Sequence, residues 1–552
     1  MFRILRKIVG YLFGIVFGIG LLIAGTMACL YCTADMGEPV FDLDTTDYPI
    51  ERRDGTACCG GSTLRRNPAG IWELTTGGES VVRGAESGAL LRDLMYYQEK
   101  VFVDQIRRIV PSESYLRFLR ALIIIFNRDM AACIPEEYRL EIAAQARFCT
   151  PEFDAIGTPY ERQINYHAAH DIGHAMQEYM LVGCSSFAAW DTQTADSTLL
   201  VGRNFDFWVG DDFARNKLVT FCCPEKGYSF ASIGWAGMCG VLSGMNTEGL
   251  AVTLNAAKGP LPARVATPIS LLARTILQYA ASIDEALAIA DTARTFVSES
   301  LLIASAHDRR AAIIEKTPRR TELYAPDADW IRCTNHYQAD AFRDDPLNLE
   351  NLETSDSHYR FERLGELMEN LRPLDPERAA AILRDRRGLG DADIGLTNEK
   401  SLNQAIAHHA VVFQPEKLRM WVSTDPWQAG PMICYDLHRI FAGDRRERLD
   451  CADRMILADE RFLSEDYPRI IRYRNHVALL REAIRSGNDA EEMVRELLKD
   501  NPQYFGAWEL CGDYFAMRGE ADEARRHWQQ ALRLEIPRTR QKEAIERKLN
   551  KL

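Results

Sequence analysis

Residues 179–207 read YMLVGCSSFAAWDTQTADSTLLVGRNFDF, and this stretch decides the fold prediction. A Gly-Cys pair at 183 and 184 precedes two runs with the composition of β-strands, 185–190 and 198–207, and turn-forming residues separate the runs. We expect the runs to pair as an antiparallel hairpin. The end of the second run, with its charged side chains, then lies beside the start of the first.

The side chains of this hairpin suit acyl chemistry. Cys184 is a good acyl acceptor only as a thiolate, so it needs a base and a positive neighbourhood. Cleavage of the peptide bond between Gly183 and Cys184 would supply that base, because the new α-amine has a reference pKa near ~8. Gly183 has no Cβ and can take the strained backbone that attack by the neighbouring thiol needs. Arg203 can favour the thiolate, and Asp206 can hold the α-ammonium group.

Three further motifs follow in order, NTEGL at 246–250, TLN at 253–255 and TNHY at 334–337. Together with Cys184 and GRNFD at 202–206, they resemble the N-terminal nucleophile hydrolases of the choloylglycine hydrolase and isopenicillin N acyltransferase (peptidase C45-like) family. That family includes bile-salt hydrolases and penicillin acylases of the same type. The order and the spacing of the motifs carry the resemblance, because no single motif is decisive.

The resemblance spans residues 70–440 and implies an α+β fold, the αββα four-layer sandwich. It implies that the folded chain cuts itself between Gly183 and Cys184, and it implies neither a cofactor nor a metal. The family has another arginine later in the chain, and the sequence does not decide between Arg360, Arg363 and their neighbours.

The resemblance also implies a role for each motif residue. Cys184 is the nucleophile and, through its freed amine, the base, while Arg203 and Asp206 tune and orient it. Asn255 and Asn335 match the positions of the oxyanion hole, where one donor can be worth about 3 kcal/mol. Each residue also has a plainer interpretation, as buried packing, an ion pair or a hydrogen bonder at a strand end.

The stretch YHAAHDIGHAM, at 166–176, offers a metal site as an alternative. His167, His170 and His174 share one face of a predicted helix and, with Asp171, could approach a metal ion. The first and last histidines lie about 10 Å apart along such a helix, so three ligands on it rarely converge. We therefore expect this helix to pack beside the Gly-Cys junction, with histidines hydrogen-bonded in the interface.

The composition of the 552 residues indicates two or three globular domains, because 47% of them are apolar. A formal charge of -13, from 66 basic and 79 acidic residues, argues against a nucleic-acid partner. Fourteen cysteines are too few for a dense disulfide framework in a chain of this size, so most are expected to be packing residues or occasional bridges.

The segment 1–35 is predicted to be a membrane anchor or a signal segment. Three basic residues precede an uncharged run at 8–34, and roughly 20 apolar residues span a bilayer. Positive charge before the run favours a cytosolic amino terminus and an extracytoplasmic, or periplasmic, catalytic domain. Cleavage of the segment as a signal peptide is the alternative, and the protein would then be secreted.

Three further regions follow along the chain. Residues 36–183 read as a linker, exposed over 45–66, and a helical pro-segment, whereas 184–445 alternate short strand-like runs with helices and are the predicted catalytic core. Residues 455–552 resemble tetratricopeptide repeats, helix-turn-helix units of about 34 residues, and 471–552 could dock a protein partner. A helical hairpin that closes the catalytic domain is the alternative for this tail.

The sequence therefore favours an exported, membrane-anchored enzyme. It would hydrolyse a linear amide in a small acylated substrate, or transfer the acyl group, through a Cys184 thioester. A non-catalytic binding or scaffold protein that works through the helical tail is the first alternative. A metal-dependent hydrolase built on the histidine helix is the second.

Overall fold

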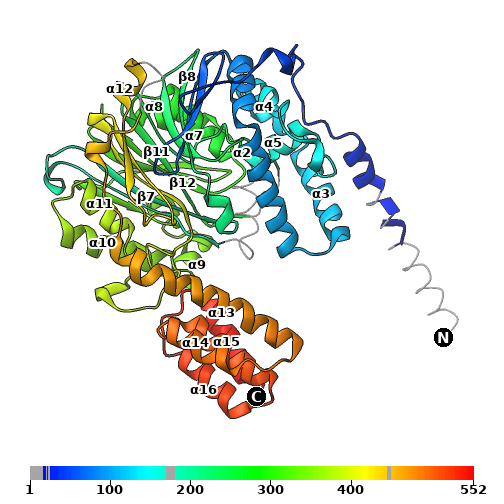
Figure 1. Cartoon of the computed structure of the whole chain (residues 1–552), viewed down its shortest axis with the longest axis vertical. Coiled ribbons are helices and arrows are strands. Elements are labelled where there is room, and N and C mark those ends of the chain that lie inside the picture. The colour runs from blue at the N-terminus through cyan, green and yellow to red at the C-terminus, as the bar shows by residue number, and fades with distance from the viewer. Residues whose placement is uncertain are drawn as a thin grey trace.

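The structure is a computed structural model, and it describes residues 17–19, 21–22, 25–168, 181–260, 262, 264–443 and 449–552, with the side chains of 181 and 182 left out. Two β-sheets form the body, and helices cover their outer faces (Figure 1). A unit of helices near the carboxyl terminus lies against one end of this body.

The larger sheet has eleven strands in the order β1-β2-β3-β4-β8-β9-β10-β11-β12-β13-β14. Its neighbours are antiparallel except for β4 and β8, which pair in parallel. The strands are β1 (Glu51–Arg53), β2 (Thr56–Cys59), β3 (Ser62–Arg66), β4 (Trp72–Gly78), β8 (Leu218–Pro224), β9 (Phe230–Gly234), β10 (Ser243–Asn246), β11 (Leu250–Ala256), β12 (Glu299–Ser305), β13 (Arg310–Lys316) and β14 (Thr321–Tyr324).

The smaller sheet has seven strands and runs β15-β6-β7-β16-β17-β18, with β5 paired to β7. The predicted hairpin is confirmed, because β6 and β7 are antiparallel neighbours with Ser186 opposite Arg203. The strands are β5 (Leu181–Val182), β6 (Ser185–Ala189), β7 (Leu200–Trp208), β15 (Trp330–Cys333), β16 (Ala407–Gln414), β17 (Arg419–Ser423) and β18 (Met432–Asp436).

The two sheets pack face to face. In β12, Leu302 and Ala304 join the core between the sheets, whereas Leu301 and Ile303 join the core under the helices. In β16, Val411 lies in the core between the sheets and Val412 in the core on the other face. Alternate residues of a strand point to opposite faces, so each sheet is buried on both sides. The predicted αββα layering is confirmed.

Helices cover both outer faces. On the larger sheet lie α2 (Ser80–Ile109), α4 (Glu136–Ala146), α5 (Pro159–His167), α7 (Ile269–Tyr279) and α8 (Ile283–Thr292). On the smaller sheet lie α10 (Ser357–Leu371) and α11 (Pro376–Leu383). Among the described residues, the body also contains α3 (Glu113–Asn127), α9 (Pro346–Thr354) and α12 (Leu437–Ala442).

The expectation of an exposed linker at 45–66 is wrong, because residues 51–66 form β1, β2 and β3 of the larger sheet. Buried partners explain the polar composition that suggested a linker. Ser62 donates to Glu86 at 2.6 Å, and Arg65 pairs with Glu73 at the same distance. The segment 36–183 is consequently not only helical, since it supplies β1 to β4 to the larger sheet and β5 to the smaller one.

The helical tail, defined here as residues 467–552, contains α13 (Tyr467–Ser486), α14 (Glu491–Asp500), α15 (Phe505–Met517), α16 (Ala521–Ala531) and α17 (Thr539–Leu549). A Cβ on Gly512 would lie 2.4 Å from the ring of Trp528, so α15 and α16 pack closely at this point. Ala524 and Ala531 are buried as the repeat pattern requires. The assignment to the tetratricopeptide class stays a prediction.

No helix within the described ranges combines the length and the apolar composition that a bilayer crossing requires. Much of the segment 1–35 lies outside those ranges, and its prediction as an anchor stays a prediction.

Candidate active site

Cys184 lies directly before β6 and is fully buried. The backbone N–H of Gly183 donates to the carbonyl of Asp206 at 3.3 Å, which holds the Gly183–Cys184 junction against the end of β7. The hairpin therefore places Cys184, Arg203 and Asp206 together, as the sequence predicts.

Arg203 lies against the thiol of Cys184, with Nη2 at 3.7 Å from Sγ. Its Nη1 donates to the carbonyl of Leu242 at 3.1 Å and to Ser243 Oγ at 2.5 Å. Ser243 Oγ is in turn 2.8 Å from Nε2 of His409, which is also buried. These contacts fix the guanidinium, and burial lowers its pKa while the neighbouring Cys184 raises it.

The thiol of Cys184 is protonated near neutral pH in the uncut chain. Burial raises its pKa to about 11, and the charge of Arg203 only partly opposes this rise. The charge of Asp206 raises the pKa further. A guanidinium alone thus does not produce a thiolate here, and a base is needed.

Asp206 is fully buried, and within the described part of the chain neither of its carboxylate oxygens has a hydrogen-bond partner. Burial raises its pKa to about 8, against the opposing charges of Arg360 and Arg203. A buried acceptor without a partner is costly. The uncut chain therefore carries an unsatisfied acid beside the junction where the sequence predicts a new ammonium group.

Asn255 and Asn335 both face this region but are already engaged. Asn255 donates through Nδ2 to the carbonyls of Cys333 and Thr334, both at 3.1 Å. Asn335 donates through Nδ2 to the carbonyl of Ala256 at 2.7 Å. The amide of Asn255 has no free donor in the uncut chain, whereas that of Asn335 keeps one hydrogen.

Of the two arginines that the sequence left open, Arg360, on α10, is the one that contacts the Cys184 junction. Its Nη1 donates to the carbonyl of Cys184 at 2.8 Å and to Ser185 Oγ at 2.9 Å, and its Nη2 donates to Asn335 Oδ1 at 2.5 Å. Arg363, one turn later, instead pairs with acidic residues such as Asp385 at 2.9 Å. The signal in the sequence that could have favoured Arg360 is Asp356, an acidic residue four positions earlier on the same helix face, with which Arg360 forms an ion pair.

Gly183 does not have the left-handed backbone that favours glycine, so the structure does not support the strained conformation expected there. A Cβ at this position would lie 2.8 Å from Nε2 of Gln404. That amide nitrogen is buried and has no hydrogen-bond partner among the described residues. A small residue at 183 thus leaves room for a side-chain amide beside the junction.

His167 is a core histidine. Its Nδ1 is 2.7 Å from the carbonyl of Gln163, and its Nε2 accepts from the N–H of Cys239 at 2.8 Å. With both ring nitrogens bonded and its pKa lowered to about 4 by burial, it has no lone pair for a metal. His170, Asp171 and His174 lie outside the described residues, and the rest of the described chain contains no cluster suited to a metal ion.

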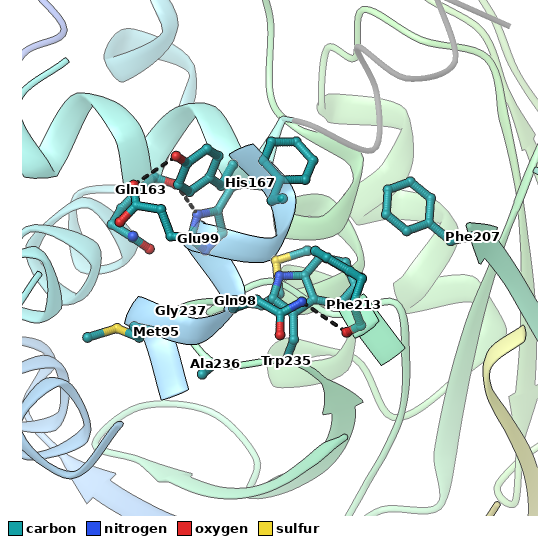
Figure 2. A pocket seen from close by; sticks show the side chains of 13 residues that line it. Met95, Gln98, Glu99, Gln163, His167, Phe207, Phe213, Trp235, Ala236 and Gly237 are labelled. Atoms are coloured by element: carbon teal, nitrogen blue, oxygen red, sulfur yellow. Dashed lines mark hydrogen bonds between the residues drawn. The ribbon is translucent and has the colours of Figure 1, made fainter. Parts of the chain in front are cut away.

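A cavity lies between the amino-terminal helices and β7, with about 30 Å³ of free volume (Figure 2). Phe207, next to Asp206 in β7, lines it together with Phe213 and Trp235. Met95 on α2 and His167 on α5 complete opposite parts of the wall. The cavity is thus lined mainly by aromatic and other apolar side chains, and the amino-terminal segment supplies part of its lining.

Comparison with known proteins agrees with the resemblance read from the sequence. Residues 192–426 match the family of acyl-coenzyme A:6-aminopenicillanic acid acyl-transferases. An uncharacterized protein of Archaeoglobus fulgidus is 23% identical over 281 residues, which cover 46% of this chain and 46% of that protein. The chain therefore spans about half the length of this relative.

Three solved structures resemble part of the chain. The Caenorhabditis elegans ortholog of N-acylethanolamine-hydrolyzing acid amidase is 17% identical, with 42% of this chain and 93% of that chain covered and a TM-score of 0.31. Penicillin V acylase from Agrobacterium tumefaciens is 14% identical (48% and 89%, TM-score 0.33). A variant of conjugated bile acid hydrolase from Clostridium perfringens is 14% identical (46% and 93%, TM-score 0.30). Likenesses at this level assign no function, whereas the family match supports an enzyme that acts on amides or transfers acyl groups.

Proposed function

We propose that this chain is a self-cleaving cysteine hydrolase or acyltransferase, which cuts its own Gly183–Cys184 bond and then uses Cys184 on a linear amide. One observation carries the proposal. A buried thiol beside Arg203 and the carboxyl group of Asp206, which has no hydrogen-bond partner among the described residues, lie at the same junction. A purely structural hairpin has no need for a buried acid without a partner.

Self-cleavage proceeds by transfer of an acyl group within the chain. Sγ of Cys184 forms a bond to the carbonyl carbon of Gly183, the bond from that carbon to the nitrogen of Cys184 breaks, and the thiol proton ends on the nitrogen. Water then adds to the thioester, which releases the carboxylate of Gly183 and restores the thiol. The new α-ammonium of Cys184 supplies the donor that Asp206 lacks in the uncut chain.

Turnover repeats this chemistry on a substrate. The α-amine of Cys184 takes the thiol proton, Sγ attacks the amide carbon, and the ammonium returns the proton to the departing amine. Water resolves the thioester in hydrolysis, and a second amine resolves it in acyl transfer. Arg203 stabilises the thiolate, and the hydrogen of Asn335 Nδ2 that remains free can donate to the oxyanion.

The substrate is a small acylated amide. The cavity that begins at Phe207 is too small, at about 30 Å³, to hold an acyl group, so only the apolar character of its lining favours an apolar acyl group. The family match, to acyl-coenzyme A:6-aminopenicillanic acid acyl-transferases, supports chemistry on an acyl group.

A panel of linear amides that differ in the acyl group tests the proposal. Wild-type protein should release the amine from at least one member, and Cys184→Ala should release none. Cys184→Ser should retain slow release, because a hydroxyl is a poorer nucleophile than a thiolate. Full activity in Cys184→Ala would overturn the assignment of the nucleophile.

A further inference from the structure

The helical tail contacts the body through two buried carboxylates of the body. Glu399 Oε2 accepts from the hydroxyl of Tyr504 at 3.4 Å, and its Oε1 accepts from Nε2 of Gln541 at 3.3 Å. Asp356 Oδ2 faces Nε of Arg538, also at 3.4 Å. The tail thus supplies polar partners to two buried acidic side chains of the body.

Asp356 belongs to the same network as the nucleophile. Its Oδ1 accepts from Nη2 and Nε of Arg360, at 2.8 and 3.2 Å. Arg360 in turn donates to the carbonyl of Cys184 and to Asn335 Oδ1. A continuous chain of contacts therefore runs from Arg538, the residue before α17, through Asp356 and Arg360 to the carbonyl of Cys184.

The three side chains that link the tail to the Cys184 carbonyl are largely buried. The side chains of Asp356 and Arg360 are 6% and 1% exposed, and that of Arg538 is 19% exposed. Two guanidinium groups lower the pKa of Asp356 against burial, with Arg360 the stronger and Arg538 next. Without Arg538, one oxygen of a buried carboxylate loses its cationic partner, and the carboxylate is free to turn.

Other contacts between the tail and the body fix the position of Arg538. The backbone of Tyr504, in the tail, lies 2.5 Å from where a Cβ on Gly395 would stand. Asn398 Nδ2 donates to the carbonyl of Glu535 at 3.0 Å, three residues before Arg538. With the contact of Gln541 to Glu399 after it, the tail is thus seated on the body on both sides of Arg538.

We propose that Arg538 is a positioning residue of the active site, which orients Arg360 through Asp356 and makes the helical tail part of the catalytic unit. This inference rests on the proposed function. Arg538 touches neither the nucleophile nor substrate, and its effect is to hold the guanidinium that touches the carbonyl of Cys184 in one orientation.

Arg474 is the matched control. It also joins the tail to the body, with Nη1 at 2.7 Å from Asp211 and Nη2 donating to the carbonyl of Ala405 at 2.8 Å. Within the part of the chain that the structure describes, Arg474 contacts neither Asp356 nor Arg360. Loss of Arg474 therefore weakens the seating of the tail but leaves the chain to the nucleophile intact.

The experiment compares R538Q, R538K and R474Q in the full-length protein. Turnover is measured on cut enzyme with an amide that wild type hydrolyses, and kcat and KM are determined separately. We expect R538Q to lower kcat at least tenfold with KM within twofold, R538K to be intermediate, and R474Q to stay within twofold of wild type. If R538Q does not fold, R538K and R474K give the same comparison.

Wild-type kcat in R538Q, or an equal loss in R474Q, would overturn the proposal, since the tail would then act only by stabilising the fold. An inactive, uncut wild type would instead refute the proposed function. In that case thermal unfolding of R538Q, D356N and the double variant, each in the uncut Cys184→Ala chain, still tests the contact. The shifts in unfolding temperature of the two single variants are expected not to add up to that of the double variant. Additive shifts would contradict a contact between Arg538 and Asp356.

Discussion

At the scale of single residues, the environment of the Asp206 carboxyl group differs between the uncut chain and the cut chain. The uncut chain buries its carboxyl without a partner and raises its pKa to about 8, chiefly through burial. After cleavage an ammonium group would lie beside the same carboxyl, which favours the ionised form. Asp206 thus destabilises the uncut state relative to the cut state as the pH rises.

This reasoning predicts the pH dependence of stability in the uncut Cys184→Ala chain. The folded pKa of Asp206 is above its unfolded value, so its stabilising contribution is complete below pH ~4 and is lost as the pH rises through about 8. The loss is on the order of 5 kcal/mol at most. Urea unfolding across this range measures it, with Asp206→Asn as the control that should lack it. An identical pH slope in both chains contradicts the assigned environment.

Arg360 and Arg363 allow a sharp comparison on one helix. Both are buried, but only Arg360 contacts the Cys184 carbonyl and Asn335. Because lysine cannot replace a forked set of donors, Arg360→Lys should lower turnover about a hundredfold. Arg363→Lys should lower the unfolding temperature while leaving kcat within a few-fold of wild type. Equal kcat losses in steady-state assays would show that Arg360 has no special role.

The sequence predicted the hairpin residues of this site and, through the family resemblance, its two asparagines, but it did not place Arg360. Cys184, Arg203 and Asp206 lie on or beside one hairpin, and the strand pattern of such a short stretch can be recognised in the sequence. Arg360 comes from a helix 176 positions away, and no periodicity connects it to Cys184. Its contact depends on tertiary packing, which a single sequence does not encode in a readable form.

At the scale of elements, β4 explains how two pieces could stay together after cleavage. It pairs in parallel with β8 over seven residue pairs, from Trp72 opposite Leu218 to Gly78 opposite Pro224. Because β4 precedes the predicted cut and β8 follows it, the interface between the two pieces lies inside the larger sheet. The helix α2 adds a second contact across the predicted cut, since Tyr97 and Gln98 donate to the carbonyls of Asp212 and Phe213 at 3.0 and 3.1 Å.

We therefore predict that the cut pieces co-elute as one species on size exclusion under native conditions. They should separate only in denaturant, since separation breaks the ladder between β4 and β8. Size exclusion followed by denaturing mass analysis of each fraction is the measurement. Elution of the two pieces at different volumes without denaturant contradicts this assignment.

The first three strands show why composition misleads at this scale. The arginines and glycines of 51–66 are typical of an exposed loop, and they predicted a linker. The structure gives Arg65 and Ser62 buried acidic partners, so polar residues stand inside a sheet. By contrast, the helical character predicted for the later part of 36–183 is confirmed by α2, α4 and α5.

At the scale of the whole molecule, the tail and the body form one unit. The sequence indicated the helices of the tail and suggested an independently folded module. Tyr504, Arg538 and Gln541 instead reach buried carboxylates of the body. Such contacts join positions more than a hundred residues apart, and the repeat pattern, which describes only neighbouring helices, does not predict them.

The most direct test of the account is the intact mass of purified wild-type protein beside that of Cys184→Ala. We predict two masses for wild type under denaturing conditions, with a new amino terminus at Cys184, and a single uncut chain for Cys184→Ala. The reason is that an acylated nitrogen on Cys184 is an amide and cannot serve as the base for a thiol whose pKa is about 11. Full amide-hydrolase activity in a wild-type chain that keeps the 183–184 bond would contradict the central claim.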